Sequence, residues 1–285
     1  QIFFYWFQSK YIAWLRADLS EFYFTGYLKL PRLFYLRSNV SELIKNITSE
    51  VEYFSAAIFS ISTVLMEIFI LIFISIFLLT TNLKISFITI SILLIYSLLI
   101  YFFNAKYVNN LGKQRSREIN ERFKIIIEFL SGNKIIKLLD IDNNLIKKFK
   151  FHNNKLAHIY QQTTFRNSLP KPLFEILFVA LITVFLLSLY KNQLEIQNIF
   201  PILGTFIAAG YRLIPSFGRI ISQLQIYKFL IPSSQKLFTD KDKFIIPFKD
   251  EKKNNFKFFE KKILLDKVTF SYHKNDKDEK NIILD

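Results

Sequence analysis

Two apolar runs separated by a long basic segment constrain the fold of this chain more than any other feature. Residues 85–103 carry no charged side chain, and residues 174–190 carry one, Glu175. Each run approaches the length of about 20 residues that a helix needs to cross a bilayer. Residues 104–172 between them hold fourteen basic and five acidic residues. A Lys and Arg excess of this kind marks the cytoplasmic side, so the order is membrane, cytoplasm, membrane.

The basic segment has the periodicity of a helix. Its apolar residues recur at the spacing of one helical face, namely Ile119, Phe123, Ile126, Ile127 and Leu130. A helix over residues 104–130 would extend about 40 Å at 1.5 Å per residue, well beyond the lipid headgroups. The pattern therefore predicts that the membrane helices continue as long cytoplasmic helices. We expect the Ser-Gly-Asn stretch at residues 131–133 to end the first of them.

Composition supports an integral membrane protein. The chain is 51% hydrophobic and yet carries a net charge of +15. Apolar spans that alternate with basic cytoplasmic segments explain both values, and part of that charge is expected to attract anionic lipid. The uncharged runs argue against nucleic-acid binding. With no cysteine and only three scattered histidines, which we expect on the surface, no metal site is predicted.

Four spans are expected, at about residues 57–79, 85–103, 173–190 and 196–221. The short turns at residues 80–84 and 191–195 carry one basic residue each. Short turns with little positive charge are typical of the non-cytoplasmic side. All four spans therefore agree on a multi-pass protein of the inner (plasma) membrane whose long basic loops are cytoplasmic.

The residues before the first complete span are also read as helical. The aromatic residues 1–7 are too few to cross a bilayer and suit the last turns of a helix. Proline lacks an amide donor, so Pro31 should interrupt the helical pattern that follows. Asn39, after Ser38, is a candidate N-cap for the next helix.

Glu67 and Arg212 are charged side chains inside expected spans and are candidate functional residues. Glu67 is penalised by about 2.5 to 3.5 kcal/mol at the bilayer centre, so it should face the bundle interior or a wet cavity. It is either a substrate-path residue or a carboxylate paired with a neighbouring helix, and the sequence favours neither. Arg212 poses the same question: it binds an anionic group, pairs with Glu67, or extends toward the cytoplasmic interface.

A short amphipathic segment follows the basic helix. It is capped by Asp142 and places Leu145, Ile146 and Phe149 on one face. Such a segment either docks another domain or closes a helical turn, and periodicity alone favours the second reading.

The last part of the chain changes in composition. Residues 238–262 form a lysine-rich linker, and residues 263–272 have the β-branched and aromatic content of a strand. The polar turn that follows leads to residues 281–284, a candidate second strand. Because the chain starts at Gln1 and stops soon after this turn, we expect it to be part of a longer protein.

These residues carry a resemblance to a family. The apolar hairpins with long cytoplasmic arms, followed by Leu-Leu-Asp-Lys-Val-Thr-Phe-Ser-Tyr at 264–272 and Ile-Ile-Leu-Asp at 282–285, resemble an ABC exporter. The resemblance implies an all-α transmembrane domain over residues 1–237 and the first β-strands of a truncated ATP-binding domain over residues 263–285. It also implies that Tyr272 stacks on adenine. The segment headed by Asp142, with Leu145, Ile146 and Phe149, would then be the coupling helix that docks on the ATP-binding domain.

The same resemblance implies an ATP-driven, alternating-access transporter that works as a dimer and moves a lipidic, glycolipid or other amphiphilic substrate. Residues 212–216 (Arg-Leu-Ile-Pro-Ser) are similar to a sequence in flippases of lipid-linked oligosaccharides. ATP and Mg²⁺ would be cofactors of the full-length protein. These 285 residues contain no phosphate loop of the G-x-x-x-x-G-K-[ST] type, so we expect no catalytic residue and no complete nucleotide site among them. A secondary transporter that uses Glu67 and a membrane scaffold or sensor with helical stalks stay open as alternatives.

Overall fold

The computed structural model describes residues 2–81, 83–140, 142–191 and 196–244. The chain divides into two compact units, residues 1–246 and 247–285, and the description below concerns the first. Within the described residues every regular element is a helix. The linker expected at residues 238–262 begins inside a helix that continues to Phe244. The rest of that linker and the strand expected at residues 263–272 lie outside the described residues.

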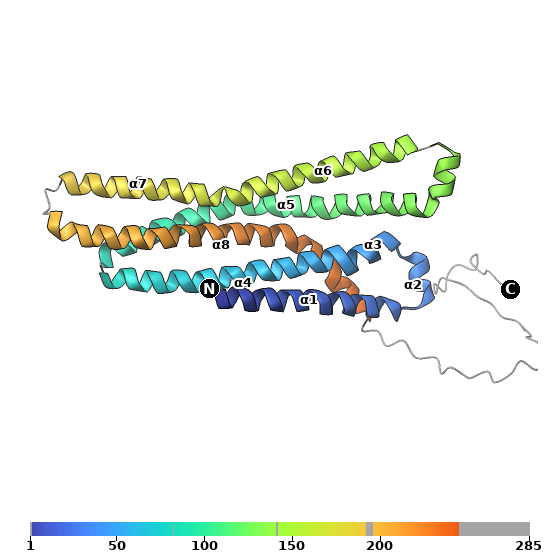
Figure 1. The fold of residues 1–285 in the computed structure, drawn as a ribbon, viewed down its shortest axis with the longest axis horizontal. Helices are drawn as coiled ribbons and strands as arrows, with labels where there is room; N and C mark the ends of the chain where they lie inside the picture. The colour runs from blue at the N-terminus through green and yellow to red at the C-terminus, as the bar shows by residue number, and fades with distance from the viewer. Residues whose placement is uncertain (1, 82, 141, 192–195, 245–285) are drawn as a thin grey trace, which may run out of the picture. The chain divides into compact units, whose positions relative to one another are not determined.

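Long helices lie side by side along one axis (Figure 1). In chain order the elements are α1 (Ile2–Leu28), α2 (Arg32–Arg37), α3 (Val40–Lys45), the π-helix η1 (Asn46–Glu50), α4 (Val51–Thr81), α5 (Leu83–Leu138), α6 (Asp142–Ser168), α7 (Pro170–Lys191) and α8 (Ile196–Phe244). The α4–α5 and α7–α8 connections lie at one end of the bundle, and α2, α3 and the α5–α6 connection lie at the other (Figure 1). This arrangement matches the predicted alternation of short and long connections.

The expected helix breaks near the N-terminus are confirmed. α1 ends at Leu28, and α2 begins at Arg32 directly after Pro31. Asn39 is the N-cap of α3, and its Oδ1 accepts a hydrogen bond from the Ser41 amide at 3.0 Å. The aromatic residues from Ile2 onward belong to α1, a continuous helix of 27 residues.

The long helix predicted from the basic segment is present, but its predicted end is wrong. α5 has 56 residues and runs through residues 131–133 as far as Leu138. The helix ends instead at Leu138, and Asp140 just after it adopts a φ of 50°. Ser131 and Gly132 form a pair of the kind at which helices bend rather than end, and the last turns of α5 turn aside in Figure 1. The helix headed by Asp142 is also longer than expected, because α6 has 27 residues.

Three helical stretches are long and apolar enough to cross a membrane among the described residues: Val40–Thr81, Leu83–Leu138 and Asp142–Val184. Their outer surfaces carry large apolar side chains, with Phe73 exposed at 72% and Phe103 at 82%. A lipid environment removes the penalty for such exposure. The fourth expected span, residues 196–221, forms the first half of α8, and its opening side chains lie outside the described residues.

α8 contributes to each of the three clusters of buried apolar residues found in the described part of the unit. The first cluster joins the apolar parts of α4, α5, α7 and α8 and consists of Leu78, Leu93, Ile100, Phe174, Ala209, Leu213, Ile214, Phe217 and Ile221. The second surrounds Phe229 and Leu230, and the third surrounds Leu237. α8 therefore connects the apolar end of the bundle to the end where the long connections lie.

Gly112 lies where the backbones of α5 and α8 come close together. A Cβ atom at this position would lie 2.3 Å from the carbonyl oxygen of Phe229. Only a residue without a side chain permits this backbone contact.

Candidate functional site

Glu67 lies in α4 and is completely buried against α8. Its Oε1 accepts a hydrogen bond from Arg219 Nε at 2.6 Å, and its Oε2 accepts one from Arg219 Nη2 at 3.2 Å. The Glu67 side chain is 0% exposed, whereas that of Arg219 is 37% exposed. Two parallel charge-assisted bonds of this kind hold the guanidinium in one orientation. The carboxylate thus fixes Arg219 while part of the guanidinium side chain still reaches the surface of the chain.

Arg219, not Arg212, is the recorded partner of Glu67. The sequence offered Arg212 as one possible partner, but Arg212 lies about two helical turns before Arg219 in α8. Arg219 lies inside the same expected span, so a count of opposite charges within the membrane would have identified it. Its Nη2 also donates to Ser216 Oγ at 3.4 Å.

Arg212 and Arg219 share one face of α8. Residues seven apart in an α-helix differ by about 20° in direction and lie about 10 Å apart along the axis. The Arg219 side of α8 packs against Glu67 of α4, and Leu213, Ile214 and Phe217 on the other side of α8 are buried. Arginines at this depth avoid lipid, so their face is suited to a wet cavity or a second chain.

A second group of charges lies buried outside the apolar spans. Lys45 Nζ contacts Glu50 Oε1 at 2.7 Å with both side chains essentially unexposed. Lys45 Nζ also donates to Ser116 Oγ of α5 at 3.4 Å. The sequence did not predict the Lys45–Glu50 pair, because side chains five residues apart do not meet in an α-helix.

Arg115 of α5 lies beside this pair, between two aromatic rings. Its Cζ is 3.9 Å from the centroid of the Tyr53 ring and 4.4 Å from that of Phe229. The side chain is fully buried, and burial disfavours the charged form and lowers the pKa of Arg115. The contact joins α4, α5 and α8 at one point, next to the Gly112 crossing.

His152 of α6 is only partly exposed and pairs with Glu118, whereas His158 is exposed, as expected of a surface residue. Its Nδ1 lies 2.6 Å from Glu118 Oε2, and the two side chains are 21% and 12% exposed. Lys155 Nζ reaches the other oxygen of Glu118 at 3.6 Å. This group fastens α6 to α5 along the basic segment.

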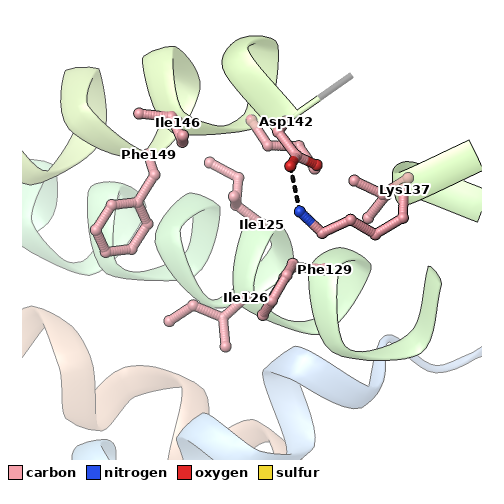
Figure 2. Close-up of a pocket in the computed structure, with 9 residues that line it drawn as sticks. Ile125, Ile126, Phe129, Lys137, Asp142, Ile146 and Phe149 are labelled. Atoms are coloured by element: carbon pink, nitrogen blue, oxygen red, sulfur yellow. Dashed lines mark hydrogen bonds and ion pairs between the residues drawn. The ribbon is translucent and has the colours of Figure 1, made fainter. Parts of the chain in front are cut away.

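The four residues predicted to couple to another domain lie together at the α5–α6 end. Asp142, Leu145, Ile146 and Phe149 line a cavity of about 340 Å³ between the two helices, with Ile125, Ile126, Phe129, Ile136 and Lys137 on the α5 side (Figure 2). Lys137 forms an ion pair with Asp142 at the edge of this cavity. That contact raises the pKa of Lys137, because the hydrogen bond and the negative charge both favour its protonated form.

Tyr272, the residue predicted to stack on adenine, lies outside the described residues. No group of His, Cys, Asp and Glu side chains that could hold a metal ion occurs in the described part of the chain.

Comparison with known families identifies the kind of protein to which these helices belong. Residues 1–208 match the family model of the ABC transporter transmembrane region. The match spans well over half of the 285 residues and includes α1 to α7 and the start of α8. The chain therefore belongs to the ABC transporter transmembrane family and is a membrane transport protein.

Proposed function

We propose that the chain is the membrane domain of an ATP-driven exporter that moves an amphiphilic substrate with an anionic group. The single observation that carries this proposal is the face of α8 that presents Arg212 and Arg219. Glu67 neutralises one of these two positive charges, so the face keeps a net positive charge in a region of low dielectric constant. An anionic headgroup is the substrate chemistry that such a face attracts most strongly.

The partial exposure of Arg219 supports a binding role. The Glu67 carboxylate occupies Nε and Nη2, which leaves the remaining guanidinium edge as a donor. A guanidinium oriented in advance loses less entropy when it binds a carboxylate or a phosphate. In this reading Glu67 is a positioning residue, and Arg212 and Arg219 contact the substrate.

The α5–α6 end of the bundle is suited to dock an ATP-binding domain and to receive its movement. Ile146 is 61% exposed beside the apolar cavity, so an apolar partner surface would bury it on docking. In the full-length protein the partner would be an ATP-binding domain that begins near residue 263, with Tyr272 stacked on adenine and with Mg²⁺ bound beside the phosphates. Two copies of the chain, with their long loops on the cytoplasmic side, would enclose the substrate path between them and change its accessible side as ATP closes the nucleotide domains.

The geometry of Glu67 favours this proposal over a secondary transporter. A carboxylate that takes up and releases protons or ions during transport must become free of its partner. The bidentate contact with Arg219 and complete burial oppose such a cycle.

Transport by the full-length protein in liposomes tests the proposal. The probes are fluorescent analogues of phosphatidylglycerol, which is anionic, and of phosphatidylcholine, which is zwitterionic. We expect ATP-dependent movement of the anionic probe, and Arg212→Gln should slow it about tenfold or more, the equivalent of one lost ionic contact. The matched control is Arg117→Gln, which removes an exposed arginine of α5 outside the apolar span.

Wild-type rates for the anionic probe in Arg212→Gln would contradict the role of the α8 face. Absence of any ATP-dependent transport, with either probe, would contradict the exporter itself. Tyr272→Ala gives a separate measurement, because unchanged nucleotide affinity in that variant would remove Tyr272 from the nucleotide site.

A further inference from the structure

The π-helix η1 interrupts an otherwise continuous helical rod. Residues Val40–Thr81 form α3, η1 and α4 in succession, with no turn between them. A π segment holds one more residue per hydrogen-bonded turn than an α-helix, and such segments occur frequently at functional sites. η1 is the π segment among the described helices. It lies between the apolar part of α4 and the bend between α2 and α3, which we call the α2–α3 elbow.

The Lys45–Glu50 ion pair depends on the π geometry. Residues five apart in an α-helix differ by about 140° in direction, so their side chains leave opposite sides of the helix. The wider turn of a π-helix, with its i to i+5 hydrogen bonds, brings such residues onto the same side. The contact of 2.7 Å between Lys45 Nζ and Glu50 Oε1 therefore forms only in the π register.

A buried ion pair of this type is better suited to fixing a register than to adding stability. Removing two charges from water offsets most of their mutual attraction, whereas breaking the pair leaves a buried charge. The Lys45 and Glu50 side chains are 0% and 1% exposed, so both would suffer this penalty if the register changed.

Neighbouring helices hold the same segment. Ser20 Oγ of α1 donates to the carbonyl oxygen of Ile47 at 3.0 Å, and Asn46 Nδ2 donates to the Tyr27 hydroxyl of α1 at 3.0 Å. Lys45 in turn reaches Ser116 of α5. The π register is thus coupled to contacts with two other helices, and a change in their positions would act on it directly.

We propose that Asn46–Glu50 is a two-state register switch, and that the Lys45–Glu50 pair is the latch that holds it in the π state. Return of this segment to the α register would turn α2 and α3 by about 100° relative to α4 and move them by about 1.5 Å, the change that one residue makes in an α-helix. The α2–α3 elbow lies at the same end of the bundle as the α5–α6 connection (Figure 1). A role of this switch in coupling to ATP rests on the proposed function, but the existence of two registers does not.

Spin-label distances in the full-length protein, reconstituted in lipid nanodiscs without nucleotide, test the switch. The 285 residues contain no cysteine, and Leu36 of α2 and Leu130 of α5 are exposed at 66% and 68%. Nitroxides attached to cysteines at these two positions should show one distance in the otherwise unchanged protein. Glu50→Gln should add a second distance, shifted by several ångströms, because the latch is lost.

Deletion of Thr48 supplies the matched control. Thr48 is exposed, and its hydroxyl bonds within its own helix to the Ile44 carbonyl oxygen at 2.7 Å. The deletion leaves Lys45 and Glu50 four residues apart, so they pair in an ordinary α-helix and the two flanking helices keep their directions. We expect a single distance close to that of the parent, and the deletion should also abolish the second distance of Glu50→Gln.

Two results would overturn the proposal. One is a single parental distance in a folded Glu50→Gln protein, and the other is a second distance that persists when Thr48 is also deleted. If Glu50→Gln does not fold, the pair Lys45→Met with Glu50→Leu removes both charges at similar volume and should show the same second distance. None of these spin-label distances depends on transport activity. A failure of the proposed function would therefore leave them unchanged.

Discussion

The helices α4, α5 and α8 each pass through two regions that are held together differently. In the apolar region, around Phe174 and Phe217, packing consists of close-fitting apolar side chains, and the fully buried carboxylate of Glu67 pairs with Arg219. Beyond it, around Arg115, buried charges and aromatic rings join the same helices. Lipid provides no hydrophobic drive for helices to associate, so the first region relies on shape. Water provides that drive in the second, where paired charges then fix which residues meet.

Removal of the Glu67 carboxylate should have the largest effect, because it leaves a charge without its partner in the apolar region. Glu67→Ala should lower the free energy of unfolding by about 3 kcal/mol, the lower end of the range for broken buried pairs, since Arg219 is partly exposed. Unfolding in mixed micelles of a mild detergent and SDS measures this. The double variant Glu67→Gln with Arg219→Gln should recover most of the loss, and a change below about 0.5 kcal/mol in Glu67→Ala would show that the pair is not buried in the protein.

A side chain at Gly112 should disrupt the boundary between the two regions. In Gly112→Ala the new Cβ meets the Phe229 carbonyl oxygen at 2.3 Å, and because this contact is backbone, the helices must separate. Overpacking of this kind costs about 1 to 3 kcal/mol. The matched control is Gly132→Ala, where the nearest atom is the end of the Ile136 side chain at 3.7 Å. That variant should be neutral or stabilised by up to about 1 kcal/mol, since alanine favours helix, and equal effects at the two positions would refute the close crossing.

Substitutions of Arg115 separate the contribution of ring stacking from that of charge to stability in the second region. Arg115→Lys keeps the charge but loses the planar group that contacts the Tyr53 and Phe229 rings, so it should cost about 2 kcal/mol. Arg115→Met should cost less, because it fills similar space without burying a charge. The same unfolding measurement gives both values. A lysine variant as stable as the parent would show that charge alone matters there.

The smallest effect is expected at the exposed Lys137–Asp142 pair. The raised pKa of Lys137 means that its contribution is fully present at neutral pH and disappears as the pH rises through that pKa. Asp142→Asn should therefore leave the midpoint of unfolding nearly unchanged and accelerate amide hydrogen exchange in the first turn of α6. Faster exchange along the whole of α6 would mean that the pair supports more than its own turn.

Much of the helix arrangement could be predicted from the sequence, because hydrophobicity, charge bias and helix punctuation are local signals. Pro31 and Asn39 end and begin helices as their chemistry requires. Ser131 and Gly132 misled the prediction, since in a long helix with tertiary contacts the propensity of two residues is overridden. The family match to the ABC transporter transmembrane region agrees with the resemblance drawn from the sequence.

The candidate sites were less predictable for a physical reason. Glu67 stands out because a charge in an apolar run is costly, but its partner lies 152 residues away in the chain. Lys45 and Glu50 gave no signal, because their spacing has meaning only in a π-helix that periodicity does not anticipate. Arg115 is one of fourteen basic residues in its segment, and nothing local separates a buried arginine from exposed ones.

The most direct test asks whether the α5–α6 end lies in the cytoplasm. In the variant Lys148→Cys, the single cysteine in α6 is treated with a labelling reagent from outside intact cells. The described bundle and the basic composition of residues 104–172 predict no reaction with a membrane-impermeant maleimide until the cells are permeabilised, and full reaction afterwards. Efficient labelling of this cysteine in intact cells would place the α5–α6 end outside and contradict the orientation, the coupling surface and the proposed direction of the driving motion together.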